Sequence, residues 1–284
     1  MRNIQANTFQ LSLQKRLKGV GGEMNLSFAL KCELGTTIGL MGASGAGKSS
    51  VLKMIAGLMK PDQGRISLGQ EVWYDHQKNL SCSPQQRRPG FVMQDYALFP
   101  NMSVRENIVF ACEQKPENEK LNHWLEKAGL LQLADQKPIQ LSGGQKQRLA
   151  LVRALITEPR LLLLDEPLAA QDPATRRQWQ SDLIAWTQSV PHMTTILVSH
   201  DPKELMRLAD LVVEIKDGKS RVIGSPLNLF SEINTHLEAE IIAVDPLRKK
   251  TVVLLGEQKL NLSWQETHQT GQMIRFTPAE IHTQ

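Results

Sequence analysis

Eight consecutive residues near the N-terminus have the types and the spacing of a phosphate-binding loop. Residues 42–49 read Gly-Ala-Ser-Gly-Ala-Gly-Lys-Ser and match the pattern G-x-x-x-x-G-K-[ST]. The glycines allow the backbone to aim several N–H groups at a phosphate, and a helix starting near Lys48 adds the positive end of its dipole. We expect Lys48 to reach the β- and γ-phosphates and the Ser49 hydroxyl to bind Mg²⁺. The nucleotide contacts are therefore expected from Gly42, Ala43, Ser44, Gly45, Ala46, Gly47, Lys48, Ser49 and Ser50.

The sequence on both sides of this loop fits its role. An apolar run at residues 37–41 is typical of a buried strand, and residues 50–59 carry apolar side chains at helical spacing. A glycine-rich turn that binds nothing is the alternative explanation. The match of the loop, together with a strand before it and a helix after it, favours phosphate binding.

An aspartate and a glutamate follow a second strongly apolar run. Residues 161–164 are all leucine, which is typical of a strand covered on both faces, and Asp165 and Glu166 come directly after them. Asp165 can hold Mg²⁺ beside the phosphate-binding loop, directly or through water. Glu166 points in a different direction and can polarise a water molecule for attack on the γ-phosphate. A buried strand that ends in a solvated turn is the alternative, and the upstream loop argues against it.

A third motif, Leu141-Ser142-Gly143-Gly144-Gln145, offers a second anion site. A serine and two glycines at the start of a helix provide a hydroxyl, exposed N–H groups and the positive end of a helix dipole. An ordinary serine N-cap would explain Ser142 alone. One nucleotide, however, does not need two such sites in one chain.

With these motifs in this order, the chain resembles the nucleotide-binding subunit of an ATP-binding cassette (ABC) transporter over residues 1–230. The resemblance implies an ATPase that uses ATP and Mg²⁺. In that family two subunits sandwich ATP between the P-loop of one and the signature loop of the other, which is residues 141–145 here. The catalytic residues that it implies are Glu166, His200 at the γ-phosphate, and Gln94 at the attacking water. The implied metal ligands are Ser49, Gln94 and Asp165, and the second subunit would contribute Ser142, Gly143, Gly144, Gln145 and Asp172.

Two features depart from the family pattern. The loop that ends at Asp172 has Ala169 where many relatives have a serine, so it offers no hydroxyl at that position. The family also stacks adenine on an aromatic side chain upstream of the P-loop, whereas residues 10–27 contain no aromatic residue. We expect an aliphatic or cationic side chain, such as Arg16, to hold the adenine instead.

The remaining pattern indicates the elements that position these residues. Strand-like and helical segments alternate before residue 228, which predicts an α/β fold with a largely parallel core sheet, as in P-loop NTPases of the ABC type. Residues 4–13 are expected to form an edge strand, followed by a turn at residues 14–23. The ATPase domain is expected at residues 1–230, with a helical subdomain at about 95–155. Short strand-like runs at residues 234–284 predict a small β-barrel-like (TOBE/OB-like) module for regulation or dimerisation.

Composition limits the class of protein. The chain of 284 residues is 41% hydrophobic and 22% charged with a net charge of +4, which suits a globular protein and gives no argument for nucleic acid. Its cysteines, Cys32, Cys82 and Cys112, form no C-x-x-C pair, so neither a disulfide framework nor a zinc site is expected. No run approaches about 18 apolar residues, and residues 1–5 lack the apolar core of a signal peptide.

Two segments narrow the resemblance. Residues 96–107, which follow Gln94, are dense in apolar side chains. In the family, the groove for the membrane subunit lies beside this segment, and the form seen here resembles importers of the oxyanion, polyamine and maltose group. The stretch 271–281 is similar to the anion-sensing module of molybdate importers. We therefore expect the ATPase subunit of a molybdate or tungstate importer, with sulfate, iron(III) and polyamine importers as rivals.

The resemblance also implies partners and a location. The expected assembly is a homodimer of ATPase subunits bound to integral membrane permease subunits at the cytoplasmic face of the membrane. A periplasmic or extracellular solute-binding protein would deliver the solute.

A soluble cassette ATPase of ribosomes or DNA repair is a rival class, but it usually has tandem cassettes or coiled-coil insertions. A P-loop kinase or GTPase is a second rival, which would not explain residues 141–145, and a GTPase would need an Asn-Lys-x-Asp guanine motif.

Overall fold

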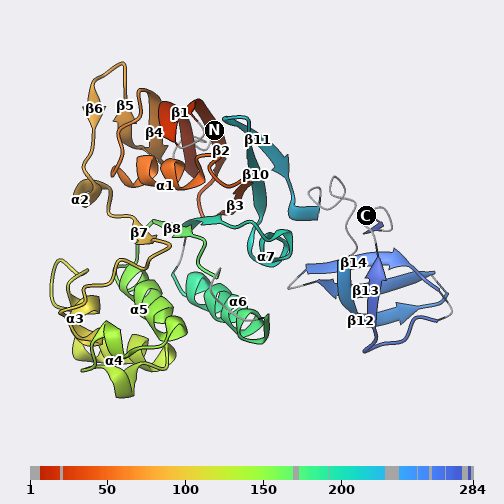
Figure 1. The fold of residues 1–284 in the computed structure, drawn as a ribbon. Helices are drawn as coiled ribbons and strands as arrows, with labels where there is room; N and C mark the ends of the chain where they lie inside the picture. The colour runs from red at the N-terminus through yellow and green to blue at the C-terminus, as the bar shows by residue number, and fades with distance from the viewer. Residues whose placement is uncertain are drawn as a thin grey trace.

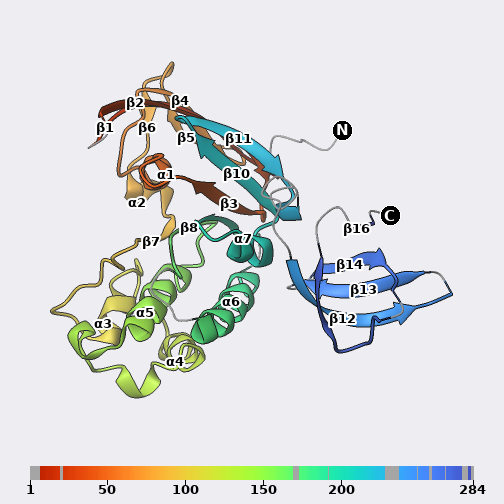
Figure 2. The same cartoon turned by 45° about the vertical axis from the view of Figure 1, so that its right-hand side comes forward.

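A computed structural model describes residues 7–19, 22–168, 173–190, 192–227, 237–247, 249–255, 258–265, 267–276 and 281–282. In these residues the chain forms one large mixed sheet with helices on both sides and a separate small antiparallel sheet near the C-terminus (Figure 1). A second view shows the same division (Figure 2). The predicted α/β fold with a C-terminal β module is therefore confirmed.

The large sheet combines a parallel core with an antiparallel flank. Its strand order is β6-β5-β4-β1-β2-β11-β10-β3-β9-β8-β7. Neighbours from β10 to β7 pair in parallel, whereas neighbours from β6 to β2 pair antiparallel. The strands are β1 (Thr8–Gly19), β2 (Gly22–Glu33), β3 (Thr37–Gly42), β4 (Gln63–Leu68), β5 (Glu71–Asp75), β6 (Leu80–Ser81), β7 (Gly90–Val92), β8 (Leu161–Asp165), β9 (Thr194–Val198), β10 (Leu211–Lys216) and β11 (Lys219–Gly224).

Helices cover both sides of the parallel core. In both views α1 lies with the antiparallel strands, and α3, α4, α5 and α6 form a helical lobe on the opposite side (Figures 1 and 2). The helices are α1 (Lys48–Ala56), α2 (Pro84–Arg87), α3 (Val104–Val109), α4 (Asn118–Lys127), α5 (Gly143–Leu155), α6 (Pro173–Gln188) and α7 (Pro202–Leu208), with 3₁₀ turns at Leu131–Leu133 and Pro138–Gln140. Among the described residues, none of these helices has the length and hydropathy of a membrane span.

The four leucines of β8 show how the core sheet is buried on both faces. Leu161 and Leu163 pack into the cluster that contains α1, whereas Leu162 and Leu164 pack into the cluster of the helical lobe. Each is at most 1% exposed. Because side chains alternate along a strand, an uninterrupted apolar run buries both faces, as the sequence predicted.

The first hairpin is longer and more central than the sequence predicted. β1 extends to Gly19 and β2 begins at Gly22, so most of the expected turn is strand. β1 pairs with both β2 and β4, and it is therefore an interior strand instead of an edge strand. The prediction was wrong because Gln14 and Arg16 occupy the exposed face, where an antiparallel strand carries polar side chains without ending.

The C-terminal sheet has the order β15-β12-β13-β14-β16, and every pair is antiparallel. Its strands are β12 (Leu237–Asp245), β13 (Lys250–Leu255), β14 (Gln258–Ser263), β15 (Met273–Phe276) and β16 (Ile281–His282). Its core includes Ile241, Val253 and Phe276, and Met206 of α7 packs into the same cluster. Since Met206 is only 3% exposed, while Leu205 packs into the cluster of the helical lobe, α7 belongs to the packing of this module as well as to that of the large sheet. The expected boundary near residues 230–234 lies outside the described residues.

A buried arginine fixes the C-terminal end of α1. Arg87 is 5% exposed, and its guanidinium donates to the carbonyl oxygens of Met54 and Ile55 at 2.8 Å, Cys82 at 3.0 Å and Trp73 at 3.3 Å. The last carbonyl groups of a helix have no partner within the helix, and here a fixed cation supplies their donors. Arg87 therefore anchors the end of α1 that is opposite to the glycine-rich loop.

We predict that Arg87→Met lowers the free energy of unfolding by about 3 kcal/mol, because it leaves buried carbonyl groups without donors. Denaturant titration followed by tryptophan fluorescence measures the loss. Arg88→Met is the matched control, since Arg88 forms an exposed ion pair with Glu113 and should cost less than about 1 kcal/mol. Equal losses in the two variants would contradict the anchoring role of Arg87.

Candidate active site

The glycine-rich loop connects the end of β3 to the start of α1, as its motif requires. Gly42 has a φ of 149°, and a methyl group added there would lie 2.5 Å from the carbonyl oxygen of Ile215 in β10. Gly47 has a φ of 98° and is the N-cap of α1, without a side chain that caps the helix. The first N–H groups of α1 therefore have no side-chain acceptor, which suits a phosphate at the helix start.

The loop surrounds a buried lysine. Lys48 is 8% exposed, and its Nζ donates to the carbonyl oxygens of Gly42 and Ala43, both at 2.9 Å. These bonds hold the ammonium group at the loop itself. The other positions of the motif lie around it: Ala43, Ser44 and Gly45 are exposed, and Gly42, Ala46, Gly47, Ser49 and Ser50 are half-buried.

The structure brings Ser49 and Asp165 together although they are far apart in the sequence. The Ser49 hydroxyl donates to Asp165 Oδ1 at 3.1 Å. Asp165 is 6% exposed, and burial raises its pKa; the neighbouring Glu166 acts in the same direction, while the Ser49 hydrogen bond and Lys48 act in the opposite one. A hydroxyl and a carboxylate at this distance match the oxygen ligands of Mg²⁺, which usually takes one or two carboxylates with substrate phosphates and water. The residues present therefore fit this ion.

Glu166 and His200 face one another from the ends of neighbouring strands. β8 and β9 pair in parallel, with Asp165 opposite Val198. Glu166 has a φ of 50°, a left-handed conformation that is costly for this residue type, and its N–H donates to the Val198 carbonyl at 3.1 Å. Glu166 Oε2 lies 3.9 Å from His200 Nδ1, which is too long for a direct hydrogen bond. The two side chains are therefore neighbours without a direct hydrogen bond between them.

Gln94 follows the next strand of the same parallel set. β7 pairs with β8, Val92 opposite Leu164, and Gln94 is exposed two residues beyond the end of β7. The carboxyl ends of parallel strands meet at one edge of the sheet, which is where ligands bind in open α/β folds. The sheet thus collects Gln94, Asp165, Glu166 and His200 at the edge that also carries the P-loop.

The signature loop lies in the helical lobe, apart from the P-loop of its own chain. α5 runs among α3, α4 and α6, whereas α1 lies on the other side of the sheet (Figures 1 and 2). Ser142 is the N-cap of α5: its hydroxyl accepts the Gln145 N–H at 3.3 Å, and its own N–H donates to Gln145 Oε1 at 2.8 Å. Ser142 and Gly143 are exposed, Gly144 and Gln145 are half-buried, and an added methyl at Gly143 would meet nothing within 4 Å. Asp172 and the rest of its loop, residues 169–172, lie outside the described residues.

Two leucines that the sequence did not single out contact the P-loop. A methyl group added at Gly47 would lie 3.3 Å from both Leu17 and Leu26. Arg16, one example of the aliphatic or cationic side chain expected at the adenine, lies on the exposed face of β1, where it pairs with Glu23. A base resting on this side of the loop would meet aliphatic side chains, which can pack on its ring but cannot distinguish one base from another by hydrogen bonds. The alternation of side chains along β1 places Leu13, Lys15 and Leu17 on the same, inward face of the strand. This pattern was the signal in the sequence that could have identified Leu17 as a neighbour of the loop.

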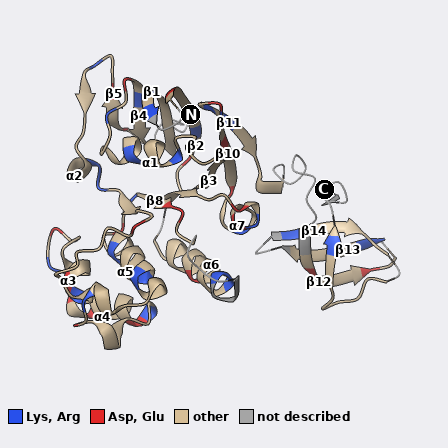
Figure 3. Ribbon diagram, in the orientation of Figure 1, with Lys and Arg blue, Asp and Glu red and all other residues tan. Residues whose placement is uncertain are grey.

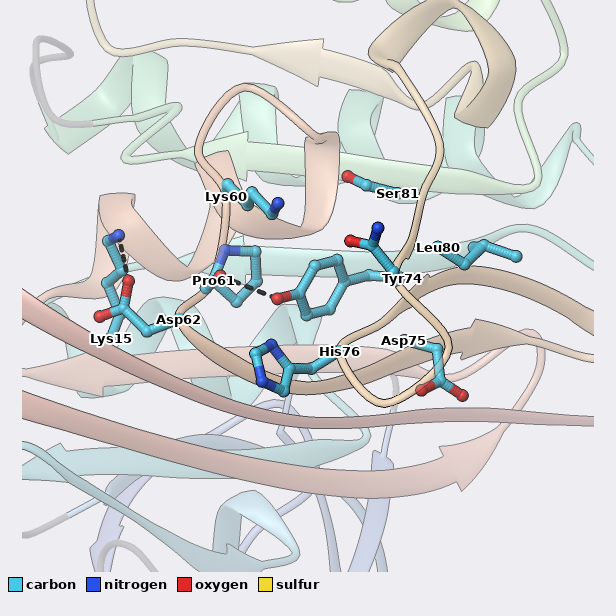
Figure 4. Close-up of a pocket in the computed structure, with 10 residues that line it drawn as sticks. Lys15, Lys60, Pro61, Asp62, Tyr74, Asp75, His76, Leu80 and Ser81 are labelled. Atoms are coloured by element: carbon cyan, nitrogen blue, oxygen red, sulfur yellow. Dashed lines mark hydrogen bonds and ion pairs between the residues drawn. The ribbon is translucent and has the colours of Figure 1, made fainter.

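A separate groove of about 340 Å³ lies beyond the other end of α1 (Figure 4). Lys15, Asp62 and Tyr74 line part of it: Lys15 Nζ contacts Asp62 Oδ1 at 2.7 Å, and the Tyr74 hydroxyl donates to the Pro61 carbonyl at 2.9 Å. None of the residues that the sequence predicts for nucleotide binding lines this groove. It is therefore not the nucleotide site.

Lys and Arg positions and Asp and Glu positions are interspersed along the described ribbon, in the large sheet, the helical lobe and the C-terminal sheet (Figure 3). Among the described residues no cluster of three or more His, Cys, Asp or Glu side chains could hold a metal ion by itself.

Comparisons with known proteins agree with this geometry. A family model described as "ABC transporter" matches residues 25–169. The chain is 36% identical over 256 residues to "Molybdenum import ATP-binding protein ModC" of Brucella abortus (strain 2308), covering 87% of this chain and 71% of that protein. It is 43% identical over 208 residues to "Probable sulfate/thiosulfate import ATP-binding protein CysA" of Chlorella vulgaris, covering 70% of this chain and 84% of that protein.

A solved structure has the same fold. It is the dimeric structure of a post-hydrolysis state of the ATP-binding cassette MJ0796 bound to ADP and Pi, with a TM-score of 0.63 and 28% identity over 76% of this chain and 98% of that one. The motifs, their arrangement at one edge of the sheet and these likenesses agree. The chain belongs to the ABC transporter family and is an ATPase of the ATP-binding cassette type.

Proposed function

We propose that this chain is the ATP-hydrolysing subunit of an importer that takes up molybdate or tungstate. The observation that carries the ATPase chemistry is the convergence of Ser49, Asp165, Glu166 and His200 at the strand ends beside the P-loop. Glu166 can accept a proton from the attacking water, and Lys48 with the loop N–H groups can bind the phosphates. Mg²⁺ would be held by Ser49, Asp165 and Gln94 and would neutralise charge on the phosphates when bound.

The chain acts as a homodimer in this proposal. Its P-loop and its signature loop are both built for anions, yet they lie on opposite sides of the sheet of one chain. Two copies arranged head to tail would complete two sites, each with the P-loop of one copy and Ser142 of the other. The relative MJ0796, whose solved structures are dimeric, supports this arrangement.

The permease would dock on the segment after Gln94, at the membrane's cytoplasmic face. Phe110 is 60% exposed and packs edge-to-face on Phe99, with ring centroids 4.6 Å apart. Asn107 is fully buried and makes four hydrogen bonds to the backbone of residues 99–103. Arg153 of α5 donates to the carbonyl oxygens of Tyr96 and Ala97 at 2.8 and 2.7 Å. A docked partner would therefore contact a segment that is hydrogen-bonded directly to α5, the helix that begins at the signature loop.

The C-terminal module favours molybdate over its rivals. The alignment with the molybdenum importer subunit of Brucella abortus covers 87% of this chain, so it must extend beyond residue 227 into the C-terminal module. The sulfate relative covers 70% of this chain and a second molybdenum relative covers 74%, so the support for molybdate comes from the Brucella alignment and not from alignment length in general. Sulfate is the second candidate cargo, because its relatives are 41–43% identical to this chain over the part that they share, against 36–41% for the molybdenum relatives. In either case the solute would reach the permease from a solute-binding protein.

We predict that Glu166→Gln lowers steady-state ATP hydrolysis by about 10²- to 10⁴-fold, because the amide cannot accept the proton of the attacking water. ATP affinity should remain near the parental value, since Glu166 does not belong to the P-loop. Phosphate release and titration with a fluorescent ATP analogue give the two readouts. Hydrolysis at the parental rate would show that another residue is the base.

A mixing experiment tests the shared site. Lys48→Ala removes the P-loop cation, and Ser142→Arg fills the signature loop with a bulky side chain, so neither homodimer has an intact site. In the mixed dimer one site carries both lesions and the other carries neither. We predict ATP-driven dimerisation in the mixture that neither variant shows alone, measured by light scattering. Parental dimerisation by each variant alone would contradict the shared site.

An uptake experiment tests the cargo. Deleting the gene in its source organism should abolish uptake of radioactive molybdate and leave radioactive sulfate uptake unchanged. The parental gene should restore uptake, and the Glu166→Gln gene should not. Loss of sulfate uptake alone would assign the chain to sulfate, and unchanged uptake of both oxyanions would contradict the proposal.

A further inference from the structure

The backbone of the turn that carries His200 is hydrogen-bonded to the core sheet. Ser199 is 2% exposed, and its N–H donates at 3.2 Å to the carbonyl oxygen of Leu40 in β3, the strand that leads to the P-loop. The side chain of His200, in contrast, is 68% exposed. The backbone of this turn is thus tied to the core while its imidazole projects toward the edge where Glu166 lies.

A buried carboxyl group on α7 binds the same turn. Glu204 of α7 is 5% exposed, and its Oε2 accepts the Ser199 hydroxyl at 2.8 Å. The same hydroxyl oxygen accepts the N–H of Asp201 at 3.0 Å. One serine hydroxyl therefore joins the residue before His200, the residue after it and the first turn of α7.

The position of Glu204 differs from that of an ordinary helix-start glutamate. The sequence Asp201-Pro202-Lys203-Glu204 matches a capping box, in which the glutamate reaches back to the N-cap backbone. Here the Asp201 side chain caps the helix by accepting the Lys203 N–H at 2.9 Å, and Glu204 binds Ser199. Glu204 Oε1 is buried and has no hydrogen-bond partner among the described residues. Burying such a group costs stability, so its presence calls for a role beyond helix capping.

Charged groups from three elements act on Glu204. Burial raises its pKa to about 7; the Ser199 hydrogen bond opposes the rise, Asp201 and Glu166 add to it, and Arg176 of α6 opposes it. Arg176 also pairs with Asp201 at 3.2 Å. The acid is therefore neutral in acidic solution and titrates within the physiological range.

We propose that Glu204 is a positioning residue for ATP hydrolysis. Through the Ser199 hydroxyl it fixes the turn of residues 199–201, and so it holds the imidazole of His200 in place against the bound nucleotide. Glu204 does not touch the substrate itself. The inference rests on the proposed role of His200 at the γ-phosphate.

The test compares five variants of the full chain: Ser199→Ala, Glu204→Ala, Glu204→Gln, the double variant Ser199→Ala/Glu204→Ala, and His200→Ala. Ser199→Ala and Glu204→Ala should each lower kcat about ten- to hundredfold and leave KM for ATP within about twofold, because the imidazole is misplaced while the P-loop is intact. Glu204→Gln should keep most of the parental kcat, since its amide oxygen still accepts the Ser199 hydroxyl. The double variant should lose no more than the worse single variant, because both remove the same hydrogen bond. Lys203→Ala, an exposed neighbour on α7, is the matched control and should be parental.

Thermal unfolding gives a readout with a defined sign. The pKa of Glu204 is raised above its unfolded value, so the native state is favoured by this group in acid and loses that advantage as the pH rises toward about 7. Glu204→Gln cannot ionise. Its melting temperature relative to the parent should therefore rise between pH 5 and pH 8, and a difference independent of pH would overturn the buried-acid geometry.

The outcomes separate this inference from the proposed function. Parental kcat in His200→Ala would refute the role of His200 itself. Loss of activity in His200→Ala with parental kcat in folded Ser199→Ala and Glu204→Ala would overturn the positioning role alone. A lower melting temperature without a lower kcat would also overturn it. If Glu204→Ala does not fold, Ser199→Ala and Glu204→Gln still decide: a kcat loss in the first with retention in the second supports the inference.

Discussion

The hydrogen bond from Ser49 to Asp165 is the contact on which the rest of the site depends. It joins the first turn of the P-loop helix to the end of β8. The two residues can meet only because β9 separates β3 from β8 by a single strand, all three running in parallel. The apolar faces of β8 are buried on both sides, so the strand end that carries the carboxylate has little freedom to move. Arg87 holds the opposite end of the same helix.

In this site the backbone is fixed by hydrogen bonds to neighbouring strands, whereas the functional side chains project from it. Glu166 is held in a left-handed conformation with its N–H on β9, and Ser199 is bonded to β3, so their neighbours Asp165 and His200 are positioned by the sheet. The signature loop is positioned differently, by a capping box at the start of a helix in the separate lobe. Ligands would thus meet one rigid half-site on the sheet and another on the helical lobe. This separation within one chain is the physical reason for proposing that two copies share each nucleotide.

Local patterns predicted most of the core and the motif positions, whereas long-range packing was not predictable. The P-loop and β8 are set by neighbouring residues, and the structure contains both. The continuation of β1 through Gln14 and Arg16 was missed, because polar residues on a solvated face look like a turn. Arg16, given as one example of an aliphatic or cationic adenine contact, lies on that solvated face. Glu204 was not recognised because its burial depends on how α7 packs against the sheet, which no local spacing reveals.

The central claim is that one ATP is held between two copies of the chain. The most direct measurement is an experimental structure of the Glu166→Gln variant with ATP and Mg²⁺, in which slow hydrolysis preserves the nucleotide. The account predicts a dimer in which the γ-phosphate contacts Lys48 of one copy and the Ser142 loop of the other. A nucleotide bound by the P-loop of a single copy, with the Ser142 loop of every copy facing solvent, would contradict it.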